Sequence, residues 1–236
     1  MGNMPNTAAE GGNTLGRKIV DTGAFVVFFV LLAILLADLF EAYAERTPAQ
    51  RIVWPLLALP LALLISDLLS GIVHFLADNY GTEDTLFVGK RFCKPFRDHH
   101  LDPTGITRRG FIEANANTCI LSLIPLAVVV WLGPYETAAG VFWATLGTLV
   151  LITVLLTNQF HKWAHLDNPP RPIAALQRWG LILTKENHDL HHIAPYDTYY
   201  CITTGWLNPL FDRLGVLKVE ASAAREKTEA QSRRSE

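Results

Sequence analysis

Four long apolar blocks divide this chain into stretches that suit the interior of a lipid bilayer. They run from about Ile19 to Phe40, Ile52 to Phe75, Asn117 to Leu132 and Thr137 to Phe160. A helix needs about 20 apolar residues to cross the hydrocarbon core, and the first, second and fourth blocks reach that length. The third block is shorter, but the GPYE turn after it favours a helical hairpin with the fourth. The blocks therefore predict an all-α, polytopic membrane protein with about four transmembrane helices.

The first block has a second interpretation, as the hydrophobic region of a cleaved signal peptide. Arg17 and Lys18 precede it, and the small-residue sequence AYA at residues 42–44 follows it. Its apolar stretch is long for a signal peptide, and the acidic residues Asp38 and Glu41 are poor neighbours for a cleavage site. We therefore favour a retained helix.

Charge predicts that both ends of the chain lie on the same side of the membrane. With the N-terminus in the cytoplasm, the outer connections at residues 41–51 and 133–136 contain only two basic residues, Arg46 and Arg51. The other eighteen of the twenty Lys and Arg residues then lie inside, which is a strong positive-inside asymmetry. We therefore predict an integral, multi-pass protein with cytoplasmic termini. The net charge of -2 gives no sign of a nucleic-acid partner.

The histidines form the second informative pattern. All eight fall on the predicted cytoplasmic side, and the outer connections contain none. They occur at the end of the second block, in the loop after it, at the end of the fourth block and in the motif HDLHH near the C-terminus. In that order the groups are His74, then His99 and His100, then His161 and His165, and then His188, His191 and His192. The pattern predicts a histidine-rich helical cap on the cytoplasmic side.

Spacing within these groups favours metal ligands over isolated side chains. Residues four apart share a face of a helix, which pairs the two histidines of HKWAH and joins His74 to Asp78. In HDLHH, His188 would face the same way as both His191 and His192 on a helix. A lone histidine is more often a solvated or core residue, but four groups on one side of the membrane predict a metal site. A metal ion and nearby carboxylates would give both nitrogens of each imidazole a partner.

Eight histidines suggest two metal ions. One zinc ion takes four ligands and would leave half of the histidines unused, whereas two ions with open positions can use them all. Cys93, Cys119 and Cys201 form no C-x-x-C pair, so no iron–sulfur cluster or zinc knuckle is indicated. Imidazole suits iron, among other metals, and redox-active iron can activate dioxygen to cleave an unactivated C–H bond. We therefore predict a membrane-bound di-iron centre with dioxygen as co-substrate.

Three motifs carry a family resemblance. They are GKRFCKPFRDHHLDPTGITRRGFIEANANTC at residues 89–119, TNQFHKWAH at 157–165 and NHDLHHIAPYDTYYCITTGWLNP at 187–209. Over about residues 60 to 215 the chain resembles the Kua lipid desaturases. That family contains the plasmanylethanolamine desaturases and a plant plastid enzyme that desaturates the palmitate of phosphatidylglycerol. The vinyl-ether-forming branch is the closer match.

The resemblance implies a specific reaction. A 1-O-alkyl ether phospholipid, plasmanylethanolamine, would lose two hydrogens from adjacent carbons of its alkyl chain, next to the ether oxygen. The product would be a vinyl ether, a plasmalogen. Dioxygen would be reduced to water, with two further electrons taken from a donor.

The resemblance also implies the site residues. Asp98 and Asp102, beside the second histidine group, are expected to assist catalysis by orienting a histidine, with helix capping or solvation as the alternative for these acids. Asn187 stands where relatives can carry histidine, and we do not count it as a ligand. The positions expected to bind or adjoin iron are His74, Asp78, His99, His100, His161, His165, His188, His191 and His192.

Electron delivery requires a partner besides the membrane phospholipid substrate. The chain has neither a G-x-G-x-x-G motif nor the haem motif C-x-x-C-H. We therefore expect an external donor, either a cytochrome b5-like protein or a ferredoxin. The polar stretches 1–16 and 219–236 are expected to be disordered tails, which leaves residues 17–218 as the membrane-embedded desaturase domain.

Other functions stay open at this stage. An acyl-chain desaturase or an iron hydroxylase could use the same centre, and only product analysis separates these reactions. A membrane haem- or metal-binding protein without catalysis is a further alternative. Haem would need paired histidines on facing helices at membrane depth, which the predicted positions do not favour.

Overall fold

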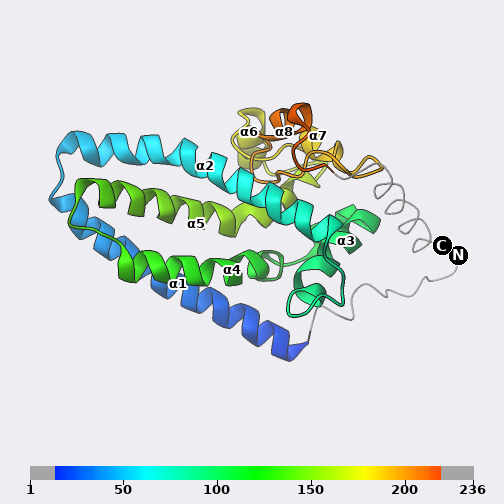
Figure 1. Ribbon diagram of the computed structural model, residues 1–236, viewed down its shortest axis with the longest axis horizontal. Helices are drawn as coiled ribbons and strands as arrows, with labels where there is room; N and C mark the ends of the chain where they lie inside the picture. Colours follow the sequence, from blue (N-terminus) through cyan, green and yellow to red (C-terminus); the bar gives the residue numbers. More distant parts are fainter. Residues whose placement is uncertain (1–13, 219–236) are drawn as a thin grey trace, which may run out of the picture.

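A computed structural model describes residues 14–218, which form helices and loops with no strand in that range. Figure 1 shows four long helices side by side along the long axis, with the short helices gathered at one end. The long helices are α1 (Leu15–Ala44), α2 (Pro48–Asn79), α4 (Phe111–Leu132) and α5 (Ala138–Ala164). The short elements are the π-helix η1 (Gly89–Cys93), α3 (Lys94–Leu101), the 3-10 helix η2 (Pro103–Arg108), α6 (Arg171–Arg178), α7 (Lys185–Asp189) and α8 (Asn208–Leu214).

All four long helices have the length and apolar character needed to cross a membrane. Their outer faces expose large apolar side chains, among them Phe40 at 80%, Ile124 at 77% and Trp131 at 71%. In water so much exposed apolar surface would promote association, whereas in a bilayer the same side chains face lipid. The prediction of an all-α protein with four membrane-spanning helices is confirmed.

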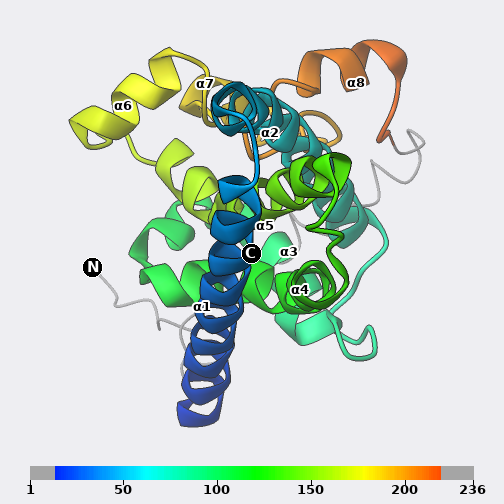
Figure 2. The ribbon, with the colours of Figure 1, turned by 90° about the vertical axis from the view of Figure 1, so that its left-hand side faces the viewer.

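The long helices pack in the order α1, α4, α5, α2. Phe28 and Leu35 of α1 lie in one buried core with Leu126 of α4 and Val141 of α5. The small residues of α2 let it approach α5 closely, as is common between helices in lipid. Figure 2, which looks along the bundle, shows α6 and α8 on either side of α2. Helix α1 supplies part of the shared core.

Threonine caps explain where several helices begin. The hydroxyls of Thr14, Thr47, Thr137 and Thr184 each accept a hydrogen bond from the backbone N–H three residues later. Thr47 and Thr137 end the short connections from α1 to α2 and from α4 to α5, so both pairs are antiparallel. The end of α2 and the end of α5 therefore lie at the same end of the bundle, which is the end that bears the histidines.

Two boundaries differ from the sequence prediction. The third block was expected from residue 117, but α4 begins at Phe111 because its polar first turns pack on protein. Asn158 donates to the carbonyl of Ala114 at 3.0 Å, and Asn117 donates to the carbonyl of Arg91 at 2.8 Å. Helix α1 begins at Leu15, just inside the expected tail 1–16. The rest of that tail up to residue 13, and the whole predicted tail 219–236, lie outside the described residues.

Candidate metal centre

The eight histidines meet at one end of the bundle because each is borne near the end of a helix. Helix α2 carries His74 and Asp78 in its last turns. Helix α5 carries His161 in its last turn, and His165 is its C-cap residue. Helix α3 ends in a histidine doublet, and α7 and the turn after it supply the remaining three. All of them except His192 are buried: His74, Asp78, His99, His100, His161, His165, His188 and His191.

The side chains form two groups, in each of which the ligand atoms all lie within 4.8 Å of one another. The five-histidine cluster consists of His99, His161, His165, His188 and His192. The Asp78 cluster consists of His74, Asp78, His100 and His191. The structure thus brings together all nine residues that the sequence predicted as ligands or close neighbours. Their metal-binding role stays a prediction.

The five-histidine cluster is built from converging Nε2 atoms. The Nε2 atom of His165 lies 2.9 Å from that of His99, 3.2 Å from that of His161 and 2.9 Å from that of His188. The Nε2 atoms of His99 and His161 are themselves 2.9 Å apart, and those of His188 and His192 are 3.0 Å apart. Three nitrogens that all approach one another cannot be satisfied by mutual hydrogen bonds, because a neutral imidazole has a single N–H.

The Asp78 cluster is arranged around one carboxylate oxygen. Oδ2 of Asp78 lies 2.9 Å from Nε2 of His100, 3.4 Å from Nε2 of His74 and 3.5 Å from Nε2 of His191. The far sides of two rings are tied to the backbone: His74 Nδ1 donates to the carbonyl of Tyr200 at 3.1 Å, and His191 Nδ1 donates to that of Thr198 at 2.7 Å. Because a carbonyl only accepts, these bonds keep the proton on Nδ1 and aim the Nε2 lone pair into the cluster.

Each histidine doublet is divided between the two clusters. His99 belongs to the five-histidine cluster and His100 to the Asp78 cluster, and His192 and His191 are divided in the same way. Neighbouring side chains on a helical turn point in different directions, so a doublet serves two sites that lie side by side. The ring centroids of His100 and His192 are 5.4 Å apart across the boundary.

This division corrects one expectation from spacing. The pairs His161–His165 and His74–Asp78 share a cluster, as helical spacing predicted. His188 was expected to face the same way as both members of the last doublet. It joins only His192, four residues on, because α7 ends at Asp189 and the following turn directs His191 toward α2.

Burial keeps the imidazoles outside the membrane-spanning helices neutral. It lowers the pKa of His165 to about 4, with the charge of Lys185 adding to the effect. It lowers the pKa of His192 to about 2, with His191 as the next contribution. The pKa values of His99 and His188 are also lowered, first by burial and then by neighbouring histidines. Neutral imidazoles keep the lone pairs that a metal ion requires.

The donor atoms fit metal ions. A metal–imidazole bond is about 2.0–2.1 Å long, so two nitrogens at right angles around one ion are roughly 3 Å apart. The closest Nε2 separations in the five-histidine cluster, 2.9 to 3.2 Å, match that value. In the Asp78 cluster, the buried Nε2 atoms of His74 and His191 have no hydrogen-bond partner among residues 14–218. Facing imidazoles this close leave no space for a porphyrin between them, which argues against the haem alternative.

Asp98 and Asp102 lie outside both clusters. Asp98 forms an ion pair with Lys94, and Asp102 forms one with Arg108. Both carboxylates are about half exposed, with 44% of each side chain accessible. Neither hydrogen-bonds to a histidine within residues 14–218. No contact within residues 14–218 supports their predicted catalytic role as histidine-orienting groups. Their exposed ion pairs agree with the alternative that these acids are solvated at the surface.

Asp67 is a buried acid that sequence reasoning did not select. It is fully buried on α2, where Oδ1 accepts backbone N–H groups from Thr203, Thr204 and Gly205 at 3.2, 2.8 and 2.8 Å. Oδ2 accepts the N–H of Leu207 at 3.0 Å. This carboxylate holds the loop directly after the residues whose carbonyls orient the rings of the Asp78 cluster. An acid in an apolar span was the available signal, because a buried charge there needs partners.

Asn187 also has a structural role. Its Oδ1 accepts a hydrogen bond from Asn208 at 2.9 Å, and Asn208 in turn bonds the backbone of Cys201 on both its N–H and its carbonyl. Asn187 is a member of neither cluster. It fastens the segment that bears the last three histidines to the loop held by Asp67.

Comparison with known proteins decides the family. The family model described as the lipid desaturase domain matches residues 63–235. The chain belongs to the lipid desaturase family. It is a multi-pass membrane protein of that family, and the match begins inside α2 and includes every residue of both clusters.

Individual relatives bear desaturase names. The chain is 44% identical to the plasmanylethanolamine desaturase of Myxococcus xanthus over 66% of its own length and 55% of that protein. It is 38% identical to plasmanylethanolamine desaturase 1 of Mus musculus over 85% of its length and 74% of the mouse protein. It is 36% identical to the chloroplastic fatty acid desaturase 4 of Arabidopsis thaliana over 66% of its length and 47% of that protein. No solved structure matches the chain.

Proposed function

We propose that this chain is a membrane oxidoreductase that desaturates a phospholipid chain at a di-iron centre formed by the two clusters. The observation that carries the proposal is the pair of adjoining, buried donor sets in a membrane protein of the lipid desaturase family. Iron bound there would supply the redox chemistry needed to activate dioxygen and remove hydrogen from an unactivated carbon. The protein's own contribution is to hold nine ligands in place and to exclude bulk water.

The substrate that the relatives favour is a 1-O-alkyl ether phospholipid, plasmanylethanolamine. The bacterial and mouse relatives carry that activity in their names. In the proposed reaction, the two carbons next to the ether oxygen each lose one hydrogen and form a vinyl ether. Dioxygen, two electrons and two protons are consumed, and two waters are released, so atoms and electrons balance.

The electrons come from outside the chain in this proposal. The expected donor is a cytochrome b5-like protein or a ferredoxin that docks at the end of the bundle bearing the clusters. We propose that this end and both termini face the cytoplasm, because eighteen of the twenty basic residues lie on that side of the predicted topology. An acidic carrier would meet a basic surface there.

One observation favours a second substrate class. The Arabidopsis relative is named a fatty acid desaturase, so acyl-chain desaturation at the same centre is the alternative reaction. Hydroxylation would use the same ligands and would differ only in its product. The bond that is altered therefore has to be identified chemically.

Lipid analysis of cells tests the proposal directly. Cells that make ether phospholipids but no plasmalogens are supplied with iron and express the intact chain, a His191→Ala variant or no chain. We expect acid-labile vinyl ethers only with the intact chain, measured by mass spectrometry before and after acid treatment. New acyl double bonds in place of vinyl ethers would identify acyl-chain desaturation as the reaction. New hydroxyl groups would identify hydroxylation.

A further inference from the structure

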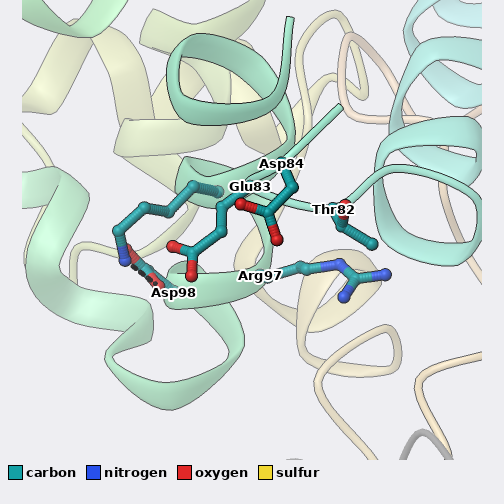
Figure 3. Close-up of a pocket in the computed structure, with 6 residues that line it drawn as sticks. Thr82, Glu83, Asp84, Arg97 and Asp98 are labelled. Carbon is teal, nitrogen blue, oxygen red and sulfur yellow. Dashed lines mark hydrogen bonds and ion pairs between the residues drawn. The ribbon is translucent and has the colours of Figure 1, made fainter. Parts of the chain in front are cut away.

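A polar pocket lies along α3, the helix that carries the first histidine doublet. Thr82, Glu83 and Asp84 line it from the loop after α2, and α3 contributes Lys94, Arg97 and Asp98. In Figure 3 the carboxylates of Glu83 and Asp84 face the space between Asp98 and Arg97. The pocket thus offers charges of both signs a short distance along α3 from His99.

Three of these charges have no protein partner. Lys94 and Asp98 neutralise each other through an ion pair at 2.7 Å. Glu83, Asp84 and Arg97 form no ion pair or side-chain hydrogen bond with any residue from 14 to 218. Nε of Arg97 is buried and still lacks a hydrogen-bond acceptor. A buried guanidinium nitrogen without an acceptor is costly, so a ligand oxygen at this position would stabilise the site.

The surroundings of the pocket fit a lipid better than a soluble ligand. The same loop continues directly into Leu86, Phe87 and Val88, which are 76%, 91% and 40% exposed. Three consecutive exposed apolar residues beside a charged pocket suit the boundary between headgroups and hydrocarbon. A phospholipid presents the same order of groups, with charge at one end and apolar chain at the other.

The chemistry of the proposed reaction requires a headgroup site close to the metal ligands. The carbons that become the vinyl ether adjoin the ether oxygen, so only the glycerol backbone stands between them and the phosphate. Wherever the headgroup binds, it cannot be remote from the clusters. Arg97 and His99 are two residues apart on α3, so their backbone positions lie within about one helical turn, although their side chains point to different faces of the helix.

We propose that this pocket binds the zwitterionic phosphoethanolamine headgroup of the lipid substrate. Arg97 would receive the phosphate, for which its planar fork of donors is suited, and Glu83 and Asp84 would receive the ammonium. The inference rests on the proposed function for the identity of the lipid. It assigns headgroup selectivity to residues that belong to neither metal cluster.

The charge pattern predicts which headgroups are selected. An ethanolamine ammonium donates three N–H bonds to carboxylates, whereas a choline quaternary ammonium has none to donate. Phosphoglycerol carries the phosphate without a cation and would leave Glu83 and Asp84 unpaired beside an anion. The expected order of affinity is therefore ethanolamine, then choline, then glycerol.

Binding measured apart from turnover tests this assignment. The full chain, purified in detergent with its metal ions, is titrated with three 1-O-hexadecyl glycerophospholipids that bear ethanolamine, choline or glycerol headgroups, and with free phosphoethanolamine. The variants are Arg97→Gln and the double variant Glu83→Gln, Asp84→Asn. Arg178→Gln on α6 is the matched control, because Arg178 is exposed and has no ion-pair partner in the described part of the chain.

We expect Arg97→Gln to weaken binding of all three lipids by at least about tenfold, since each carries the phosphate. The double variant should weaken the ethanolamine lipid most, by about tenfold, and should remove the expected order of affinity among the three headgroups. The control should stay within about twofold of the wild type, a change of less than about 0.5 kcal/mol. Metal content, measured in the same samples, should not change in any variant.

Specific results would overturn the assignment. Affinities within about twofold of wild type in both pocket variants, at full metal content, would exclude headgroup binding here. Free phosphoethanolamine that binds as tightly as the lipid would identify a soluble phosphate ligand instead. If Arg97→Gln fails to fold, the double variant still decides the question. Selective lipid binding without vinyl ether formation in cells would support the pocket and reject the proposed reaction.

Discussion

Five neutral imidazoles form one cluster, whereas the other combines three imidazoles with the carboxylate of Asp78. A divalent ion keeps its full charge among neutral ligands, but beside Asp78 its net charge falls by one. Negative charge stabilises the more oxidised state of a metal ion. Two iron ions bound in these sites would therefore be inequivalent, with the lower reduction potential at the Asp78 cluster.

The clusters also differ in how their rings are held. In the Asp78 cluster, backbone carbonyls of Thr198 and Tyr200 orient His191 and His74 from behind. In the five-histidine cluster, the buried Nδ1 atoms of His188 and of its neighbour His192 have no hydrogen-bond partner within the described chain. The first arrangement is preorganised by the protein, whereas the second depends on the ion that its nitrogens share.

Metal removal should have the largest effect and should reveal two different sites. We expect chelation to abolish desaturation and to lower the melting temperature by roughly 5–10 °C, because the converging nitrogens lose their common partner. Titrating ferrous iron back under anaerobic conditions should refill the sites in two distinguishable steps, followed by calorimetry. A single step that ends at one ion per chain would contradict the division into two clusters.

Asp78→Ala should disable one cluster and spare the other. It removes the carboxylate and leaves the three imidazoles of this cluster, so we expect one ion per chain to be lost and activity to fall by at least about 100-fold. Metal analysis of the purified variant measures the first effect and vinyl ether formation the second. Retention of two ions would show that Asp78 is not a ligand.

Asp67→Asn should weaken the Asp78 cluster from a distance. The neutral amide cannot accept four backbone N–H bonds as the carboxylate does, so the loop at residues 201–207 should loosen. The carbonyls of Tyr200 and Thr198 should then hold the rings of His74 and His191 less firmly. We expect activity to fall by about 10–100-fold, with metal lost first from the Asp78 cluster.

Ser70→Ala provides a graded comparison for Asp67. Ser70 accepts the N–H of Ile202 at 3.0 Å, which is a single bond to the same loop. Loss of this bond should lower the metal affinity of the Asp78 cluster, but by less than Asp67→Asn does. Equal loss of metal from both clusters in Asp67→Asn would indicate general unfolding rather than positioning of one site.

His192→Ala should be milder than loss of a ligand from the Asp78 cluster. Four imidazoles remain in the five-histidine cluster, a number sufficient to hold an ion. His192 is also the least buried of the eight histidines. We expect the ion to be retained with about tenfold weaker affinity and activity to fall by a similar factor. Complete metal loss, as severe as in Asp78→Ala, would remove the distinction between the clusters.

Asp102→Asn should have the smallest effect. The carboxylate pairs with Arg108 at the surface and touches no histidine in the described structure. Exposed ion pairs contribute roughly 0–1 kcal/mol, so vinyl ether formation should change by less than about threefold. A loss comparable to that of Asp78→Ala would support the catalytic role that the sequence predicted for Asp102.

The candidate site could be predicted from sequence wherever the signal was local. Helical spacing of four residues correctly paired His161 with His165 and His74 with Asp78, because the α-helix imposes that neighbourhood by itself. Asp98 and Asp102 adjoin the doublet in sequence, but they form ion pairs with Lys94 and Arg108 and belong to neither cluster. Successive side chains on a helix lie on different faces, so a neighbour of a ligand along the chain need not reach the same site.

Contacts between distant segments could not be predicted in this way. His99 meets His161 across 62 residues, and Asp67 meets the loop at Thr204 across 137. Periodicity contains no information about which helix ends will adjoin. The pocket around Arg97 depends on the same kind of contact, because its two walls come from different elements.

The sequence was sufficient to predict the four membrane-spanning helices, the end of the bundle at which the histidines gather, and imidazole and carboxylate as the metal-ligating groups. Those properties follow from hydropathy, chain direction and side-chain composition, which act over a few turns. The tertiary contacts were needed to show that each doublet divides between two sites and that His100 and His191 join His74 and Asp78. That division arises because packing of α2, α3 and α5 around the α7 segment selects which of two adjacent side chains faces each neighbour.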